Sequence, residues 1–358
     1  MGPYFITISI ATVFSALASK AEKLGLRSRT QYNILTNLML VIVSACLIFV
    51  AGLRYYVGTD YGGYYKGLTT YGEKFETAVK TLDEPGLPLV ATIVGWFAND
   101  GAYFIFFCSL ITISLILFQN YKNTDSFVFC TLLFVFIGVW HGTFNGVRQY
   151  FAAAIIFAGH RLILDKKFWK YLLVVFIAFC FHRSSIIMLI PYFIYRNRIT
   201  FRNVLLLLIG TYIISANYDT IFTFVGFLKD SEMSMGDTAY NSTTVNIFRV
   251  LTFCAPAITV LVLYWKKNPN SEQTFYINAL LANAAAMLAT SNSAYLARLS
   301  IYTNVFTPLA LSKLLKFENK MVEVTVKCIV VVLYAVFWYI EISGSKALAN
   351  FHWIWERV

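Results

Sequence analysis

The sequence predicts an all-α integral membrane protein that crosses the bilayer many times. Of its 358 residues, 58% are hydrophobic and 13% are charged, whereas soluble domains carry roughly 25% charged residues. Apolar runs of roughly 20 residues recur along the whole chain, as helices that cross a hydrocarbon layer require. We therefore expect one integral domain over residues 1–358 and no separate soluble domain.

About twelve segments are expected to cross the membrane, with ten or eleven as alternative counts. They are 3–19, 34–53, 101–118, 127–141, 147–164, 168–182, 184–195, 203–217, 248–265, 273–290, 298–315 and 321–342. The segments 168–182 and 184–195 are short for a crossing, so they are either tilted or half-helices that meet at a turn. The apolar stretch 86–98 is predicted to be re-entrant or interfacial.

The basic residues of the short loops predict the orientation. Loops after the odd-numbered segments carry 17 of the 29 basic residues but only 6 of the 18 acidic ones. These loops are 20–33, 119–126, 161–170, 196–202, 266–272 and 313–323. They are predicted to be cytoplasmic, which places both termini and the long segments 54–100 and 218–247 outside. Topology and lipid contact explain the basic surplus, and no nucleic acid is expected as a partner.

Motifs for metal or cofactor chemistry are not found. The six cysteines all lie in apolar runs, and no CxxC, HExxH, P-loop or GxSxG occurs in a suitable context. Buried small hydrophobic residues explain these cysteines better than disulfides or metal ligands do. We therefore expect no cofactor and no metal.

Arginines are predicted to gather at the outer ends of the spans. They are Arg54, Arg148, Arg183, Arg249 and Arg298. An arginine near the membrane is costly, and the positive-inside bias does not favour this side. Guanidinium groups suit phosphate oxygens, so the set predicts an anion site. Snorkelling to headgroups or pairing with a nearby acid is the alternative for each arginine.

The stretch 138-GVWHGTFNGVRQY-150 combines small and polar residues. Its glycines recur every four residues, which favours close helix approach. The polar residues His141, Asn145, Arg148 and Gln149 are predicted to share one helical face. That face suits phosphate or sugar hydroxyls, and interhelical hydrogen bonding is the alternative.

Two later stretches also place polar side chains at the outer rim. In 181-FHRSS-185, His182 lies beside Arg183 and Ser185 and is either a structural residue or a ligand contact that moves a proton. In 292-NSAYLARLSIY-302, Tyr295, Arg298 and Tyr302 are predicted to share a helical face. An aromatic belt explains many interfacial tyrosines but explains this arrangement less well.

The stretch 54-RYYVGTDYGGYY-65 concentrates tyrosine and glycine at the end of a span. Its tyrosines offer flat faces with polar tips for sugar rings, and they are Tyr55, Tyr56, Tyr61, Tyr64 and Tyr65. Gly58, Gly62 and Gly63 are predicted to allow tight turns. Asp60 is expected either to act as a base towards an acceptor hydroxyl or to pair with Arg54.

These elements together resemble the EpsG-type, Wzy-like polysaccharide polymerases. The matching stretches are RYYVGTDYGGYY at 54–65, NGVRQYFAAA at 145–154, FHRS at 181–184 and RLSIY at 298–302. They occur in the family's order and cover most of the chain. Arg183 departs from the pattern, which has a small residue or proline there.

The resemblance implies a bacterial plasma-membrane enzyme with its active site on the extracytoplasmic side. It would polymerise polyprenyl-pyrophosphate-linked repeat units into capsule, exopolysaccharide or O-antigen, and its fold would be related to membrane glycosyltransferases that use lipid-linked donors. Its partners would be the lipid-linked oligosaccharide, membrane lipid and a possible chain-length co-polymerase. A flippase for the same lipid and an O-antigen ligase-like transferase are the alternatives.

Roles for individual residues follow from this reading. Arg148, Arg298 and Arg54 would bind the pyrophosphate, with Arg183 and Arg249 beside them, and the arginines would replace a metal. Asp60 or His182 would deprotonate the acceptor. The sugar contacts would come from Tyr55, Tyr61, Tyr64, Asn145, Gln149, Tyr295 and Tyr302.

Overall fold

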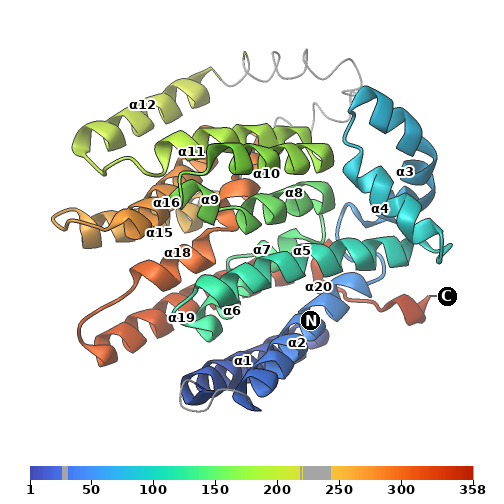
Figure 1. Cartoon of the computed structure of the whole chain (residues 1–358), viewed down its shortest axis with the longest axis horizontal. Helices are drawn as coiled ribbons and strands as arrows, with labels where there is room; N and C mark the ends of the chain where they lie inside the picture. The colour runs from blue at the N-terminus through green and yellow to red at the C-terminus, as the bar shows by residue number, and fades with distance from the viewer. Residues whose placement is uncertain (26–30, 218–219, 221–242, 358) are drawn as a thin grey trace.

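The prediction of an all-helical membrane protein is confirmed. The computed structural model describes residues 1–25, 31–217, 220 and 243–357 (Figure 1), and within these residues every regular element is a helix. Arg54 and Trp353 form an isolated antiparallel β-bridge. The predicted outer segment 218–247 lies mostly outside the described residues.

Five of the described helices are long and apolar enough to cross a membrane. They belong to α1 (Gly2–Gly25), α2 (Gln31–Gly52), α5 (Gly101–Asn123), α15 (Ile247–Tyr264) and α19 (Lys320–Gly344). Shorter apolar helices are α4 (Gly86–Gly95), α6 (Phe127–Phe136), α8 (Val147–Ala158), α10 (Phe168–Phe181), the continuous η1 (Arg183–Met188) and α11 (Leu189–Ile194), and α12 (Phe201–Ala216). The count of about twelve crossings stays a prediction.

Several predicted spans are broken into two or three helices. The span 127–141 divides into α6 and α7 (Val139–Gly142), because Gly138 between them adopts a left-handed φ of +88°. The span 147–164 divides into α8 and α9 (Arg161–Leu164). The span 298–315 divides into three helices, which are η2 (Leu296–Ser300), α17 (Ile301–Asn304) and α18 (Thr307–Leu314). Pro308 lies in the first turn of α18. None of these three segments is one continuous helix, and their crossing of the membrane stays a prediction.

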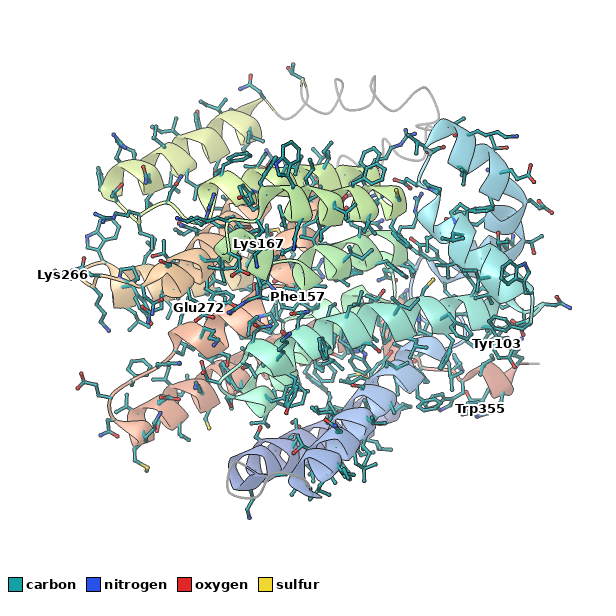
Figure 2. All side chains as sticks on the ribbon, in the orientation of Figure 1. Tyr103, Phe157, Lys167, Lys266, Glu272 and Trp355 are labelled. Atoms are coloured by element: carbon teal, nitrogen blue, oxygen red, sulfur yellow. The ribbon has the colours of Figure 1, made fainter. Side chains whose placement is uncertain are left out.

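The helices run back and forth between two ends of the molecule. Near one end, which we call the Glu84 end, Glu84 pairs with Arg148 at the start of α8. Near the other end, the Lys313 end, Arg161 just after α8 pairs with Glu272 on α16 (Ser271–Ala289). Figure 2 shows Tyr103 and Trp355 towards the first end, on the right, and Lys266 and Glu272 towards the second.

The segment 54–100, predicted to lie outside, forms two helices at the Glu84 end. They are α3 (Tyr61–Thr81) and α4, which pack on each other and on α5 (Figure 1). Gly62 and Gly63 lie inside α3, so the prediction of tight turns at these two glycines was wrong. Gly58 has a left-handed φ of +100° and does form the predicted turn.

The C-terminal segment pairs with residues 53–58, and the N-terminus contacts the same C-terminal segment. The Met1 amino group donates to the Ala349 carbonyl at 3.1 Å, and the Gly58 N–H donates to the Ala347 carbonyl at 2.9 Å. The Tyr55 N–H donates to the His352 carbonyl at 2.8 Å. The termini therefore lie at the end that holds Asp60, as the predicted topology requires, and the compartment that this end faces stays a prediction.

Candidate functional site

Glu84 joins three distant parts of the chain at one carboxylate. Its Oε2 lies 2.8 Å from Arg148 Nη1. Its Oε1 lies 2.9 Å from His182 Nδ1 and also accepts the Arg183 main-chain N–H at 2.9 Å. The turn 82–86 is thereby tied to the start of α8 and to the turn after α10.

The turn that carries Glu84 is conformationally unusual. Leu82 and Glu84 both adopt left-handed backbone angles, with φ of 53° and 49°. Each such residue costs about 1–3 kcal/mol relative to an ordinary conformation. Pro85 and Gly86 then begin α4. The contacts of the Glu84 side chain must offset this strain, so they hold the turn in place.

The Glu84 carboxylate is ionised in this setting. Burial alone would raise its pKa, but the hydrogen bond from His182, the charge of Arg148 and the Arg183 N–H together lower the pKa to about 2. An ionised carboxylate only accepts hydrogen bonds, so His182 carries its proton on Nδ1. No other described residue forms a hydrogen bond to His182 Nε2.

A second carboxylate–arginine pair lies at the same end. Asp60 Oδ2 is 3.6 Å from Arg298 Nη1. Thr59 beside it donates its N–H to Asn145 Oδ1 at 2.8 Å. The predicted alternative, an ion pair between Asp60 and Arg54, is therefore replaced by the pair with Arg298.

Contacts among neighbouring residues connect the two pairs. Gln149 follows Arg148 on α8, and its Nε2 donates to the Arg298 carbonyl at 2.8 Å. The Tyr302 hydroxyl lies 3.0 Å from Ser184 Oγ, beside His182. The motifs at 54–65, 145–154, 181–184 and 298–302 thus come together around one region, which we call the arginine site.

Arg54 is placed differently from the other predicted arginines. It has no exposed surface. Its guanidinium donates to the carbonyls of Ala51, Val57 (3.0 Å) and Phe144 (2.8 Å), and lies 4.7 Å from the Phe144 ring centre. In this conformation Arg54 supports the turn 54–58 and presents no donor to a ligand.

Two more predicted arginines have acidic partners at the rim. Arg183 Nη2 lies 3.0 Å from Asp83 Oδ1, and both side chains are well exposed. Arg249 on α15 lies 2.9 Å from Glu341 on α19. Neither of these ion pairs involves Glu84 or Asp60.

Most of the predicted sugar-binding tyrosines are packed inside the protein. Tyr61 and Tyr302 have no exposed surface and Tyr64 has little. The Tyr64 hydroxyl accepts the Arg148 N–H at 3.4 Å. Tyr55 and Tyr295 are half-buried, while Tyr56 is 57% exposed and packs edge-on against Tyr55 with ring centres 4.9 Å apart.

The predicted helical faces were wrong in two places because the chain bends there. Residues 143–146 separate α7 from α8, so His141 points into the core, where its Nδ1 accepts the Trp338 Nε1–H at 3.1 Å. Asn145 and Gln149 still reach the arginine site, but from a turn and a helix rather than one face. Tyr295 precedes η2 and so shares no single α-helix with Arg298 and Tyr302.

Glu84 is a site residue that the sequence patterns do not predict. It lies 64 positions before Arg148 and 98 before His182, and no periodic pattern connects residues so far apart. A signal was present in 82-LDEPG-86, where acidic residues stand in a Pro-Gly turn of an outer segment whose opposing rim is rich in arginine.

Comparison with known proteins identifies the family of the chain. No curated protein and no solved structure matches the chain, so a relation to other membrane glycosyltransferase folds stays a prediction. One family model, described as the EpsG family, matches residues 37–354 and so includes every residue of the arginine site. The chain therefore belongs to the EpsG family.

Proposed function

We propose that this protein is a polysaccharide polymerase. It transfers a polyprenyl-pyrophosphate-linked oligosaccharide repeat unit to an acceptor sugar at the extracytoplasmic face of the bacterial plasma membrane. Family membership supports a polymerase-type role in polysaccharide biosynthesis. The observation that supports the specific reaction is the double contact of Glu84. One carboxylate oxygen binds Arg148, whose guanidinium suits phosphate, and the other binds the imidazole of His182.

In this proposal His182 is the general base. Glu84 fixes the imidazole with the proton on Nδ1, and Nε2 removes the proton from the acceptor hydroxyl. The acceptor oxygen then attacks the anomeric carbon, the bond from that carbon to the pyrophosphate oxygen breaks, and the pyrophosphate leaves with the bonding electrons. Asp60 is the alternative base, but its nearest described cation is Arg298, which favours a role in holding that arginine.

Arg148 and Arg298 stabilise the leaving pyrophosphate. Arg148 uses one of five N–H donors for Glu84, and its side chain is 40% exposed, so further donors are available. Arg298 is 36% exposed beside Asp60. Donors already in place where negative charge develops lower the barrier without reorganisation. Arg54 is left out of this role because it is enclosed.

The sugar contacts are proposed for the more accessible residues of the site. Asn145, Tyr55 and Tyr295 are partly exposed and the ring of Tyr56 is exposed, whereas the buried residues Gln149, Tyr61, Tyr64 and Tyr302 support the walls. The product would be a capsule, exopolysaccharide or O-antigen chain, with a co-polymerase as a possible length-setting partner.

The test is reconstitution of the purified protein in liposomes with a synthetic polyprenyl-pyrophosphate-linked repeat unit. We expect a ladder of products on a gel, with and without EDTA, and loss of at least about 100-fold in rate for Arg148→Ala. The matched control is Arg202→Ala, since Arg202 is an exposed arginine at the start of α12.

Other outcomes would contradict the proposal. A normal ladder from Arg148→Ala would remove the phosphate role of that residue. Movement of the lipid across the bilayer without any ladder would indicate a flippase, and transfer to a lipid A-type acceptor alone would indicate a ligase. Loss of the ladder in EDTA would overturn metal independence, which is so far only a prediction.

A further inference from the structure

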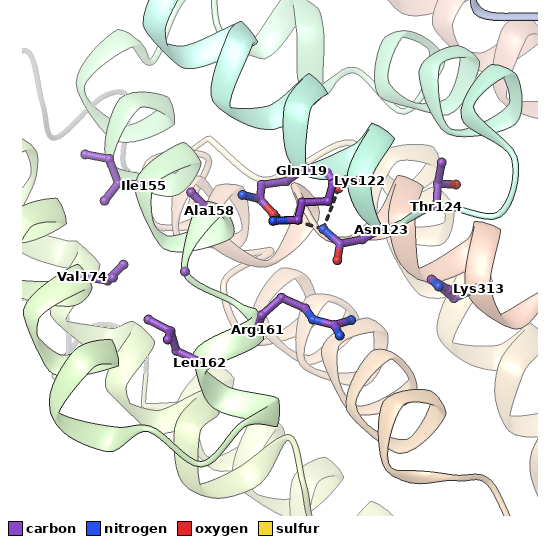
Figure 3. Close-up of a pocket in the computed structure, with 11 residues that line it drawn as sticks. Gln119, Lys122, Asn123, Thr124, Ile155, Ala158, Arg161, Leu162, Val174 and Lys313 are labelled. Atoms are coloured by element: carbon purple, nitrogen blue, oxygen red, sulfur yellow. Dashed lines mark hydrogen bonds between the residues drawn. The ribbon is translucent and has the colours of Figure 1, made fainter. Parts of the chain in front are cut away.

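A polar cavity lies at the Lys313 end, opposite the arginine site. Figure 3 shows it between the last turn of α5, the end of α8, α9, α10 and α18. Its volume is about 760 Å³. The lining includes Gln119, Lys122, Asn123, Arg161 and Lys313. The proposed polymerase chemistry makes no use of this cavity.

Cations outnumber carboxylates around the cavity. Arg161 lies 3.1 Å and Lys313 3.7 Å from the same Glu272 oxygen. Lys313 also shares Asp125 with Lys316, at 3.6 Å and 2.9 Å. Two carboxylates, Glu272 and Asp125, thus form ion pairs with three cations.

Lys122 adds a further cation to this cavity, and none of the described carboxylates pairs with it. Beside it, Gln119 accepts a hydrogen bond from Asn123 through Oε1 at 3.1 Å, which directs the Gln119 amide nitrogen into the cavity (Figure 3). The cavity therefore offers donors and positive charge without a matching anion in the described part of the protein.

The opposite wall of the cavity is apolar and lies beside exposed apolar side chains. Ile155, Leu162 and Val174 form this wall (Figure 3). Phe118, one residue before Gln119 on α5, is 58% exposed, and Leu173, one residue before Val174 on α10, is equally exposed. Since exposed apolar side chains on these helices contact hydrocarbon, the cavity lies where the acyl region and the headgroups meet.

We propose that this cavity binds a phosphate group, and that its natural source is the headgroup of an anionic phospholipid. Basic pockets between transmembrane helices on the cytoplasmic side suit such headgroups, and the predicted topology places this end in the cytoplasmic leaflet. Cations also offset the partial negative charge of helix C-termini, which accounts for Lys122 at the end of α5. That effect explains neither a cavity of this size nor its apolar wall.

The test uses the full-length protein in nanodiscs of phosphatidylcholine, with or without phosphatidylglycerol. Native mass spectrometry counts retained phosphatidylglycerol, and thermal unfolding measures its stabilising effect. We expect Lys122→Gln to weaken retention roughly fivefold, as one cation near an anionic headgroup contributes on this scale. Lys266→Gln, an exposed lysine on the same predicted side, is the charge-matched control.

A second variant separates the cavity from simple surface charge. Ala158→Leu keeps every charge but fills space at the apolar wall, so it should also reduce retention. Each variant is first shown to unfold at the wild-type temperature in phosphatidylcholine alone, which verifies that it is folded.

A comparison of inorganic phosphate with phosphatidylglycerol identifies the source of the phosphate. Equal protection by inorganic phosphate and by phosphatidylglycerol would keep the phosphate site but overturn the lipid as its source. Equal retention by Lys122→Gln, Lys266→Gln and wild type would overturn the site itself. The inference is independent of the proposed polymerase, because binding is measured without any sugar substrate.

Discussion

Two opposing effects act on the pKa of Glu84. Burial raises the pKa of its carboxyl group, but the hydrogen bond from His182 and the charge of Arg148 lower it to about 2. Its backbone is also in a left-handed conformation that a glutamate rarely adopts. Burial and backbone strain both disfavour an ionised glutamate here, so its contacts must stabilise it, which favours a positioning role. The two residues that it positions are His182, the proposed base, and Arg148, the proposed phosphate ligand.

A mutant cycle at Glu84 and His182 tests this role. We expect His182→Ala to lower the polymerisation rate by roughly 100-fold or more, the usual contribution of a general base. Glu84→Gln should cost a similar factor, because it removes the charge that fixes the imidazole. The double variant should lose less than the product of the two single losses, since both residues act on one proton transfer, and any loss beyond that of His182→Ala reflects the second contact of Glu84, with Arg148.

The control for this cycle lies one residue away. Asp83→Asn makes the same carboxyl-to-amide change but affects only the exposed pair with Arg183, so its rate should stay within about twofold of wild type, as exposed ion pairs contribute little. Additive losses in the Glu84 and His182 double variant would mean that the two residues act separately, and the positioning role would be lost.

How far the sequence predicts this site depends on the range of each contact. Arg148 and His182 could be identified locally, from guanidinium and imidazole groups at predicted outer ends of spans. The ion pair of Asp60 with Arg298 joins residues hundreds of positions apart in the chain, and so the local alternative, Arg54, was considered instead. Burial of Arg54 is equally a tertiary property, because Phe144 and Tyr61 cover it from other elements.

At the scale of elements, the turn 54–60 places Asp60 and supports Asn145. Gly58 has φ of +100°, and a Cβ built there would lie 2.6 Å from Asn145 Oδ1 and 3.1 Å from the Phe144 carbonyl. Asn145 accepts the N–H of Thr59, the next residue. A side chain at position 58 would therefore disturb the contact that holds Asp60 next to Arg298.

Glycine substitutions test this turn against the helix that follows it. Gly58→Ala should lower the free energy of unfolding by at least about 1 kcal/mol through backbone strain alone, and should also reduce polymerisation. Gly63→Ala should instead raise it by roughly 0.5–1 kcal/mol, since Gly63 lies inside α3 with open space around its Cα. Thermal unfolding in detergent measures both.

The opposite signs make the comparison informative. If both substitutions destabilise by similar amounts, residues 61–65 do not form the helical start of α3. The sequence indicated turns at all three glycines because a tyrosine- and glycine-rich stretch lacks helical periodicity. The helix forms because Tyr61, Tyr64 and Leu68 bury one side of it against the neighbouring elements.

At the scale of the whole molecule, the division of charge agrees with the arrangement of the helices. The loops 119–126, 161–170, 266–272 and 313–323 come together at the Lys313 end through ion pairs of Asp125, Arg161, Glu272 and Lys313. The distribution of basic residues in the sequence predicts the same grouping of these loops. Hydrophobic runs and loop charge thus predict the gross arrangement, whereas the breaks inside spans depend on local backbone angles such as that of Gly138.

Cysteine accessibility in intact cells tests which compartment each end faces. In a variant whose six native cysteines are replaced, Lys80→Cys on α3 and Lys266→Cys after α15 introduce single exposed thiols at the two ends. A membrane-impermeant maleimide should label Lys80→Cys in intact spheroplasts and label Lys266→Cys only after permeabilisation, because basic loops are retained in the cytoplasm. The reverse pattern would place the arginine site inside, where a polymerase acting on outer-leaflet lipid cannot work, and would place the phosphate cavity in the outer leaflet. Labelling of both residues from outside would contradict the alternation of helices between the two ends and with it the fold described above.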